Sequence, residues 1–177
     1  MTGRKLTLRS SISQVLGLIE VAYSSGGMLD ASEVNNVTDV DLDILSHVID
    51  DAEALGLLEF KEGNISLTSI GEKIAMENPK VVKKILRKQL VSVEPFKTVL
   101  KMLEEKGEID REEVVDIIVK KSNPDDLDEA FMNFIQWGLY TNIFTYDHDD
   151  EIIKPIETGG RLSSYRKRKH KLTSFFI

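Results

Sequence analysis

A pattern that occurs twice, about 80 residues apart, is the feature that most constrains the fold of this 177-residue chain. The segments 28–33 (MLDASE) and 108–113 (EIDREE) each place two strand-forming positions before an aspartate, with a glutamate three residues after the aspartate. An aspartate followed at this distance by a glutamate is an acidic variant of the capping box that begins helices. Each copy therefore predicts a short strand leading into a helix, and the recurrence indicates a duplicated module.

The first half of the chain has a recognisable order of elements. Apolar residues at helical spacing and alternating residues at strand spacing distinguish the two kinds of segment. Thr38 or Asp39 is expected to cap the third helix, and Gly56 to end it. Helices are predicted near 12–23, 30–36, 39–55 and 68–76, and strands at 28–29, 58–60 and 65–67. The order helix, strand, helix, helix, hairpin, helix is that of a winged helix-turn-helix.

The second half repeats part of this order. Pro79 and Pro95 each open a helix, as proline does at a first helical position. A further helix from Pro124 is expected to end at Gly138, in the way that the earlier helix ends at Gly56. Strands at 143–146 and 152–153 are expected to flank a polar turn at 147–150.

The sequence therefore predicts a mainly α (α+β) fold of tandem winged helix-turn-helix modules with small two- to three-stranded wings. The expected boundaries are 8–78 for the first module, 79–106 for the connecting helices, 107–156 for the second module and 157–177 for a basic C-terminal tail. Glycines at 159 and 160 predict a flexible joint before that tail. Because each half is small for independent stability, the connecting helices are expected to pack against both halves.

Composition excludes several classes of protein. The chain has no cysteine, which excludes disulfides, thiolate metal sites and a cysteine nucleophile. No apolar run approaches the roughly 18–20 residues that a membrane span needs, and no signal-length apolar stretch follows the N-terminus. We therefore expect a cytoplasmic protein with no transmembrane segment.

The net charge of −7 conceals a segregation of charge along the chain. Residues 10–78 carry 13 acidic side chains against two basic ones, and residues 122–156 carry eight against one. Residues 79–91 carry five basic side chains and no acid, and residues 157–177 carry six against one. Such asymmetry is more informative about partners than the total charge.

Several segments resemble the AAA-associated C-terminal domain family. They are residues 54–71 (ALGLLEFKEGNISLTSIG), 84–90 (KILRKQL), 134–140 (FIQWGLY) and 144–147 (FTYD). The resemblance covers roughly residues 12–156. It implies a domain that follows the ATPase of nitrate/sulfonate/taurine-type ABC transporters, or that occurs free-standing in archaea. It implies a regulatory or interaction role and carries over no catalytic residues to this sequence, and the chain has no phosphate loop of its own.

The two helices that would read DNA in such a fold are acidic and contain no lysine or arginine. Phosphate contacts from cations supply non-specific DNA affinity, so these helices would repel DNA. Their acids form either a solvated helix face or a docking face for a basic partner. The candidate docking residues are Asp39, Asp43, Asp50, Asp51, Asp125 and Asp126.

Positive charge gathers instead on the helix from Pro79 and on the tail. Each cluster is either a solvated surface or a contact for an anionic partner such as nucleic acid. The candidate residues are Lys80, Lys83, Lys84, Arg87, Lys88, Arg161, Arg166, Lys167, Arg168, Lys169 and Lys171. The apolar end 172–177 is expected to fold back onto the body or to dock on a partner.

The sequence contains no pattern that predicts an enzyme. The three histidines lie on separate predicted elements, and residues 147–150 lack the ligand spacing of a calcium loop. We predict no catalytic residue, metal site or cofactor. The leading hypothesis is a non-enzymatic regulatory module that binds a protein, either an ABC-type ATPase or a second copy in a homodimer. The alternative is a nucleic-acid-binding transcriptional regulator that uses the basic helix and the tail.

Overall fold

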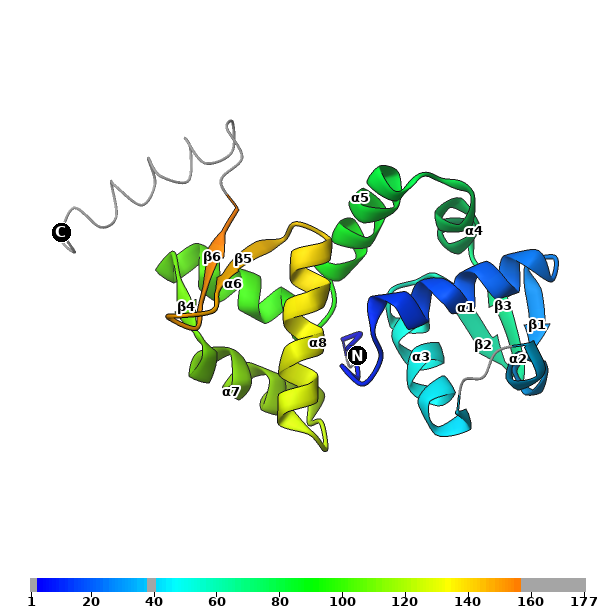
Figure 1. Cartoon of the computed structure of the whole chain (residues 1–177), viewed down its shortest axis with the longest axis horizontal. Helices are drawn as coiled ribbons and strands as arrows, with labels where there is room; N and C mark the ends of the chain where they lie inside the picture. Colours follow the sequence, from blue (N-terminus) through cyan, green and yellow to red (C-terminus); the bar gives the residue numbers. More distant parts are fainter. Residues whose placement is uncertain (1–2, 38–40, 157–177) are drawn as a thin grey trace.

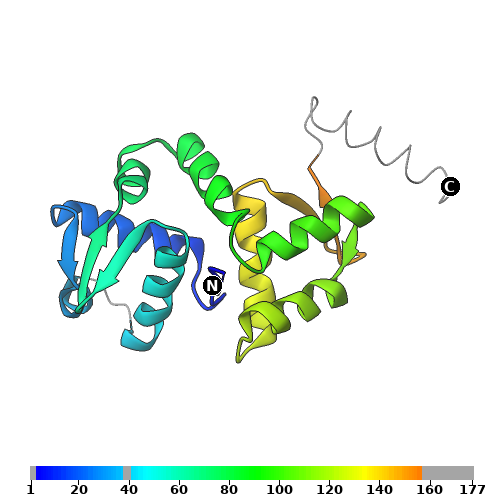
Figure 2. The same ribbon diagram turned by 180° about the vertical axis from the view of Figure 1, so that it is seen from behind.

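The structure, a computed structural model, describes residues 3–37 and 41–156. It is mainly helical, with two small antiparallel three-stranded sheets, as the α+β prediction requires. Figure 1 shows two lobes joined by α5 (Pro79–Leu90), with the N-terminal segment between them. We call residues 12–76 the first lobe and residues 96–155 the second lobe. Figure 2 shows the same division from behind.

The first lobe contains the elements that the sequence predicts, with shifted ends. Thr68 caps the last helix by accepting a hydrogen bond from the Gly71 amide. The hairpin turns at Glu62 and Gly63, both at positive φ, as a two-residue turn between right-twisted strands demands. The elements are α1 (Ile12–Ser24), β1 (Met28–Asp30), α2 (Ala31–Val37), α3 (Leu42–Ala54), β2 (Leu58–Lys61), β3 (Asn64–Leu67) and α4 (Ser69–Met76).

The second lobe repeats this order from its first helix onwards. The capping box predicted at Asp110 and Glu113 is complete, since each side chain accepts from the other residue's backbone amide. The elements are α6 (Phe96–Lys106), β4 (Ile109–Asp110), α7 (Arg111–Ser122), α8 (Leu127–Tyr140), β5 (Phe144–Asp147) and β6 (Ile152–Pro155).

The two sheets have the same topology, β1-β3-β2 and β4-β6-β5, all antiparallel. One backbone hydrogen bond fixes the equivalence between them. The Ala31 amide donates to Gly63 O over 2.9 Å, and the Arg111 amide donates to Glu151 O over 3.0 Å. In each lobe, therefore, the first residue of the helix after the short strand is bound to the turn of the hairpin.

The helix ends are equivalent too, but Gly138 does not end α8 as predicted. The helix continues to Tyr140, and Asn142 at φ +55 follows it as Gly56 at φ +74 follows α3. Asn142 is thus the counterpart of Gly56, 86 residues later. Gly138 lies inside the helix, and the position requires glycine because a Cβ atom there would overlap the ring of Phe144.

Two helix starts also differ from the prediction. Asp41 is the N-cap of α3, while Thr38 and Asp39 lie outside the described residues. Helix α8 begins at Leu127 rather than near Pro124, because the Asp126 carboxylate caps it by accepting from the Glu129 amide.

The segment 79–106 contains two differently placed helices. Helix α5 contacts both lobes: the Gln89 side chain donates to Leu55 O, and the Lys83 ammonium lies over the Tyr140 ring. Helix α6 packs into the second lobe, where Phe96 stacks on Phe134 with ring centroids 4.4 Å apart. The predicted module boundaries stay a prediction.

The aromatic residues Phe131, Phe134, Trp137 and Phe144 of the second lobe are buried, while Tyr146 is half-buried beside them. No helix in residues 3–37 and 41–156 has the length and apolarity needed to cross a bilayer. The tail 157–177 lies outside the described residues.

The close approach of Gly138 to Phe144 generates a stability prediction. Gly138→Ala forces the Phe144 ring to shift in a packed core, which costs about 1–3 kcal/mol of unfolding free energy. Gly17→Ala, in α1 with no atom near the added methyl group, is the matched control. It is expected to stabilise by up to about 1 kcal/mol. Urea unfolding of both variants tests this, and equal effects would refute the clash.

Candidate interaction surfaces

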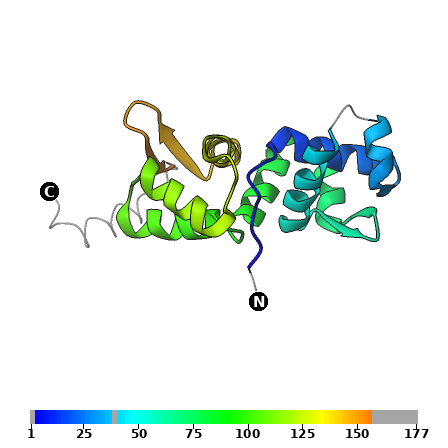
Figure 3. The same cartoon turned by 90° about the horizontal axis from the view of Figure 1, so that it is seen from below.

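The N-terminal segment, residues 3–10, runs between the two lobes in all three views, most clearly in Figure 3. It pairs with the turn between α5 and α6: the Leu6 amide donates to Glu94 O, and the Glu94 amide donates to Arg4 O, each over 2.9 Å. Leu6 and Leu8 are fully buried, at 1% and 0% exposure. The segment is therefore an integral part of the structure, although it belongs to no helix.

Asp51 of α3 holds this segment from the first lobe. Its carboxylate accepts from the Thr7 amide at 2.6 Å, from the Thr7 hydroxyl at 2.9 Å and from the Ser10 hydroxyl at 2.5 Å. The prediction that Asp51 belongs to an exposed docking face is wrong, since the residue is 1% exposed. Asp51 can be buried although it is charged, because its partners in the N-terminal segment are polar.

Helix α8 holds the same segment from the second lobe. Asn133 donates to Leu8 O over 2.7 Å, and Trp137 donates through Nε1 to Ser10 O over 3.2 Å. The 86-residue equivalence pairs Asp51 with Trp137 and His47 with Asn133. His47 contacts Arg9, which also forms an ion pair with Asp125. Matching positions of two repeated helices thus bind one segment from opposite sides.

Burial shifts the pKa of Asp51. Desolvation raises its pKa above the ordinary value of 3.8, and the hydrogen bonds from Ser10 and Thr7 partly oppose that rise. The charged form of Asp51 is therefore costly to bury, and the hydrogen bonds from Thr7 and Ser10 offset part of that cost.

The remaining candidate acids differ in what they contact. Asp43 and Asp50 are exposed on α3, and Asp39 lies outside the described residues. Asp126 is the N-cap of α8, and Asp125 is exposed but paired with Arg9. The structure therefore leaves Asp43 and Asp50 as the open part of the predicted docking face.

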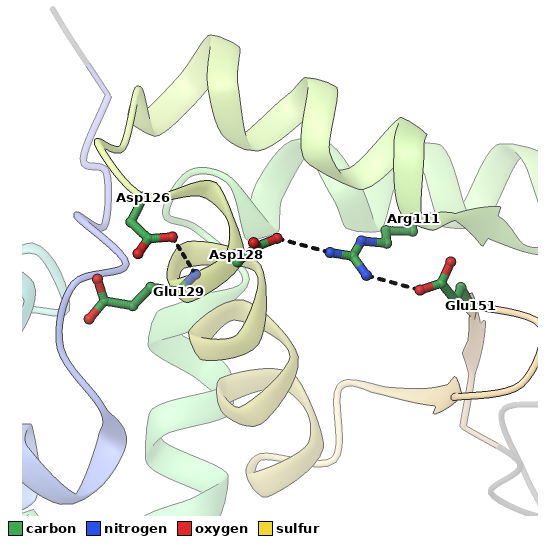
Figure 4. Close-up of polar contacts among 5 residues, drawn as sticks. All are labelled: Arg111, Asp126, Asp128, Glu129 and Glu151. Carbon is green, nitrogen blue, oxygen red and sulfur yellow. Dashed lines mark hydrogen bonds and ion pairs between the residues drawn. The ribbon is translucent and has the colours of Figure 1, made fainter.

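Arg111 organises the surface between α7, α8 and the second hairpin (Figure 4). Its guanidinium donates to Glu151 at 2.9 Å and to Asp128 at 3.2 Å. It also lies over the Phe131 ring, 4.7 Å from the centroid. The side chain thereby pairs with two carboxylates at once and covers an aromatic core residue.

The equivalent position in the first lobe is an open, largely apolar groove of about 270 Å³. Leu42 and Phe60 line it while remaining 57% and 42% exposed. The rest of the lining comes from Ala31, Ser32, Leu45, Ser46, Ile49 and Asp50.

The cations of α5 divide between two faces. Lys80, Lys84 and Lys88 are exposed and follow one another at one-turn intervals, while Lys83 and Arg87 are half-buried. The other basic candidates, Arg161, Arg166, Lys167, Arg168, Lys169 and Lys171, lie outside the described residues.

The turn 147–150 is held by Asp147, whose carboxylate accepts from the amides of Asp149 and Asp150. These backbone bonds lower the pKa of Asp147 below its ordinary value.

The contacts of residues 3–10 were not predicted. Asp51 lies 41 residues beyond Ser10 and Trp137 lies 127 beyond it, so no local spacing reveals the pairs. The alternation of Leu6 and Leu8 with polar residues was the available signal, typical of an extended segment with one buried face.

Comparison with known proteins gives one result. The family model for the C-terminal AAA-associated domain matches residues 32–147, about two thirds of the chain. The match begins inside α2 and ends with β5, so it includes Asp51 and Trp137 but not the segment that they bind. No curated protein matches the chain. No solved structure matches it either.

The buried carboxylate generates a prediction about pH. Asp51→Asn places an amide donor against hydrogen-bond donors and should lower the unfolding free energy by about 1–3 kcal/mol. Because the folded pKa of Asp51 is raised, the unfolded chain ionises first as pH rises, so wild-type stability falls relative to the variant. The stability difference should shrink between pH 3 and pH 7 in urea titrations. A difference that grows with pH would contradict the raised pKa.

Proposed function

This chain belongs to the C-terminal AAA-associated domain family, and we propose that it is a non-enzymatic, cytoplasmic protein-interaction module that docks on an ABC-type ATPase. The observation that carries the proposal is the combination of family membership with an exposed acidic face on α3. The family links the chain to an ATPase, and the acidic face supplies a surface for a partner.

We further propose that each lobe is a winged helix-turn-helix. The support is the order of elements: a helix, a short strand, two helices and a hairpin, with the short strand added to the hairpin as a third strand. In this interpretation α3 and α8 stand where the DNA-reading helices of such folds stand.

The contacts of α3 and α8 favour a protein partner over DNA for these two helices. Each uses one face to bind residues 3–10, which reduces the helix surface left to enter a DNA groove. The exposed side of α3 carries Asp43, Asp50 and Glu53, and neither helix contains a lysine or arginine. Carboxylates facing DNA phosphates would oppose binding, whereas a basic protein surface would be attracted.

The proposal predicts the outcome of a binding experiment. The full chain should bind the ATPase subunit of a nitrate/sulfonate/taurine-type ABC transporter from the same organism, measured by calorimetry. Asp43→Lys with Asp50→Lys should weaken binding about tenfold or more, because both charges face the partner.

The control is Glu105→Lys with Glu108→Lys, which changes the net charge equally through exposed residues of the second lobe. Its affinity should stay close to that of the wild type. Equal losses in both variants would show a non-specific charge effect, and no binding by the wild type would refute association with this ATPase.

One observation favours the alternative, a nucleic-acid-binding regulator. Lys80, Lys84 and Lys88 form an exposed row on α5 whose spacing suits a phosphate backbone. The row lies outside the acidic helices, so it would bind nucleic acid without them.

A salt titration separates the two functions. With a labelled DNA duplex, the leading proposal predicts no measurable anisotropy change at about 50 mM salt. Binding that is lost in Lys80→Glu/Lys84→Glu/Lys88→Glu, but kept in Lys97→Glu/Lys101→Glu on α6, would support the alternative instead.

A further inference from the structure

The two lobes differ in charge at one equivalent surface. The difference indicates which kind of segment could bind to this surface in the first lobe. Three residues of the second lobe form an ion-paired group there: Arg111, Asp128 and Glu151. The backbone hydrogen bonds described above match Arg111 to Ala31 and Glu151 to Gly63. The common helix end matches Asp128 to Leu42. The first lobe therefore has no charged side chain at any of the three positions.

The consequence is an uncovered apolar groove in the first lobe. Arg111 covers the ring of Phe131, whereas Ala31 is too short to cover Leu45, the residue that matches Phe131. Leu42 and Phe60 remain 57% and 42% exposed beside a groove of about 270 Å³. This volume lies just below that of most small-ligand pockets, so it suits the side chains of a peptide.

Carboxylates border this groove. Asp50 lines it, Asp43 lies on the same helical face two turns earlier, and Glu53 accepts from the Phe60 amide at 2.8 Å. Within residues 3–37 and 41–156, none of the three forms an ion pair. An occupant should therefore bring apolar side chains for the groove and cations for its border.

We propose that the occupant is the C-terminal segment of the same chain, residues 161–177. It carries six cations from Arg161 to Lys171 and then the apolar residues Leu172, Phe175, Phe176 and Ile177. This is the combination that the groove and its border require. The phenylalanines pack against Leu42 and Phe60, and the cations pair with Asp43 and Asp50.

Covalent attachment favours docking on the same chain. The 15 residues from 157 to 171 span at most about 50 Å when extended, a reach comparable to the size of a small protein. A flexibly linked segment also has a millimolar effective concentration, so modest contacts suffice. The segment would use the same face of α3 as the ATPase proposed above, so the two occupants exclude each other. The test below uses the chain without any ATPase, so its outcome is independent of ATPase binding.

The experiment compares amide NMR spectra of the full-length chain with those of Phe175→Ala/Phe176→Ala. Shift changes are expected at groove residues, among them Ala31, Ser46, Asp50 and Phe60. Ser163→Ala/Ser164→Ala is the control in the same segment and should leave these amides unchanged. An unlabelled peptide of residues 161–177, added to the phenylalanine variant, should restore the wild-type shifts.

A groove variant completes the test. Ala31→Arg introduces the side chain that the second lobe carries at the matching position, so the fold should tolerate it. It should weaken binding of the peptide by about tenfold or more. Ser24→Arg, exposed at the end of α1, should leave that binding unchanged. Should Ala31→Arg fail to fold, Phe60→Ser replaces it.

Three results would overturn the proposal. The first is unchanged groove amides in the phenylalanine variant. The second is peptide binding that Ala31→Arg does not weaken. The third is groove shifts that vanish on dilution of the wild type, which would assign the bound segment to a second copy.

Discussion

The buried carboxylate of Asp51 is the interaction on which the arrangement of the two lobes depends. An isolated carboxylate in a protein interior is strongly destabilising, and it becomes acceptable only when its oxygens accept hydrogen bonds. Here the backbone and hydroxyl of Thr7 and the hydroxyl of Ser10 supply them. Asn133 and Trp137 bind the other side of the same segment. The lobes are therefore connected through residues 3–10, which both of them bind, as well as through the helix α5.

The order of elements recurs in the two lobes, so equivalent helices bind this segment from both sides, while the surfaces of the lobes differ in their side chains. The repeated backbone puts equivalent helices on either side of residues 3–10. At the matching position, Asp51 accepts hydrogen bonds from this segment, whereas Trp137 donates one to it. At the hairpin, the second lobe covers its core with Arg111, while the first lobe leaves Leu42 and Phe60 exposed. One scaffold thus offers a hollow lined by the ion-paired Arg111 in the second lobe and an apolar groove without such a group in the first, and the apolar groove is the better candidate for contacts.

Much of the fold could be predicted because local chemistry decides it. The caps at Thr68 and Asp110 and the glycine after α3 follow from residues within a few positions of each other. What could not be predicted depends on distant residues. Gly138 resembled a helix end, yet its role is to accommodate the ring of Phe144. Asp51 resembled its exposed neighbours Asp43 and Asp50, and only the path of the N-terminal segment distinguishes it. The acidic residues were predicted to share one exposed face, but packing buries Asp51 and leaves Asp43 and Asp50 exposed.

We propose that this chain acts through protein contacts made by the open face of α3. Hydrogen–deuterium exchange of the full chain, with and without the ATPase subunit, locates those contacts. Exchange should slow in α3 and in the hairpin of β2 and β3 when the subunit is present, and it should stay unchanged in α5. Protection confined to α5, with α3 unaffected, would contradict this proposal.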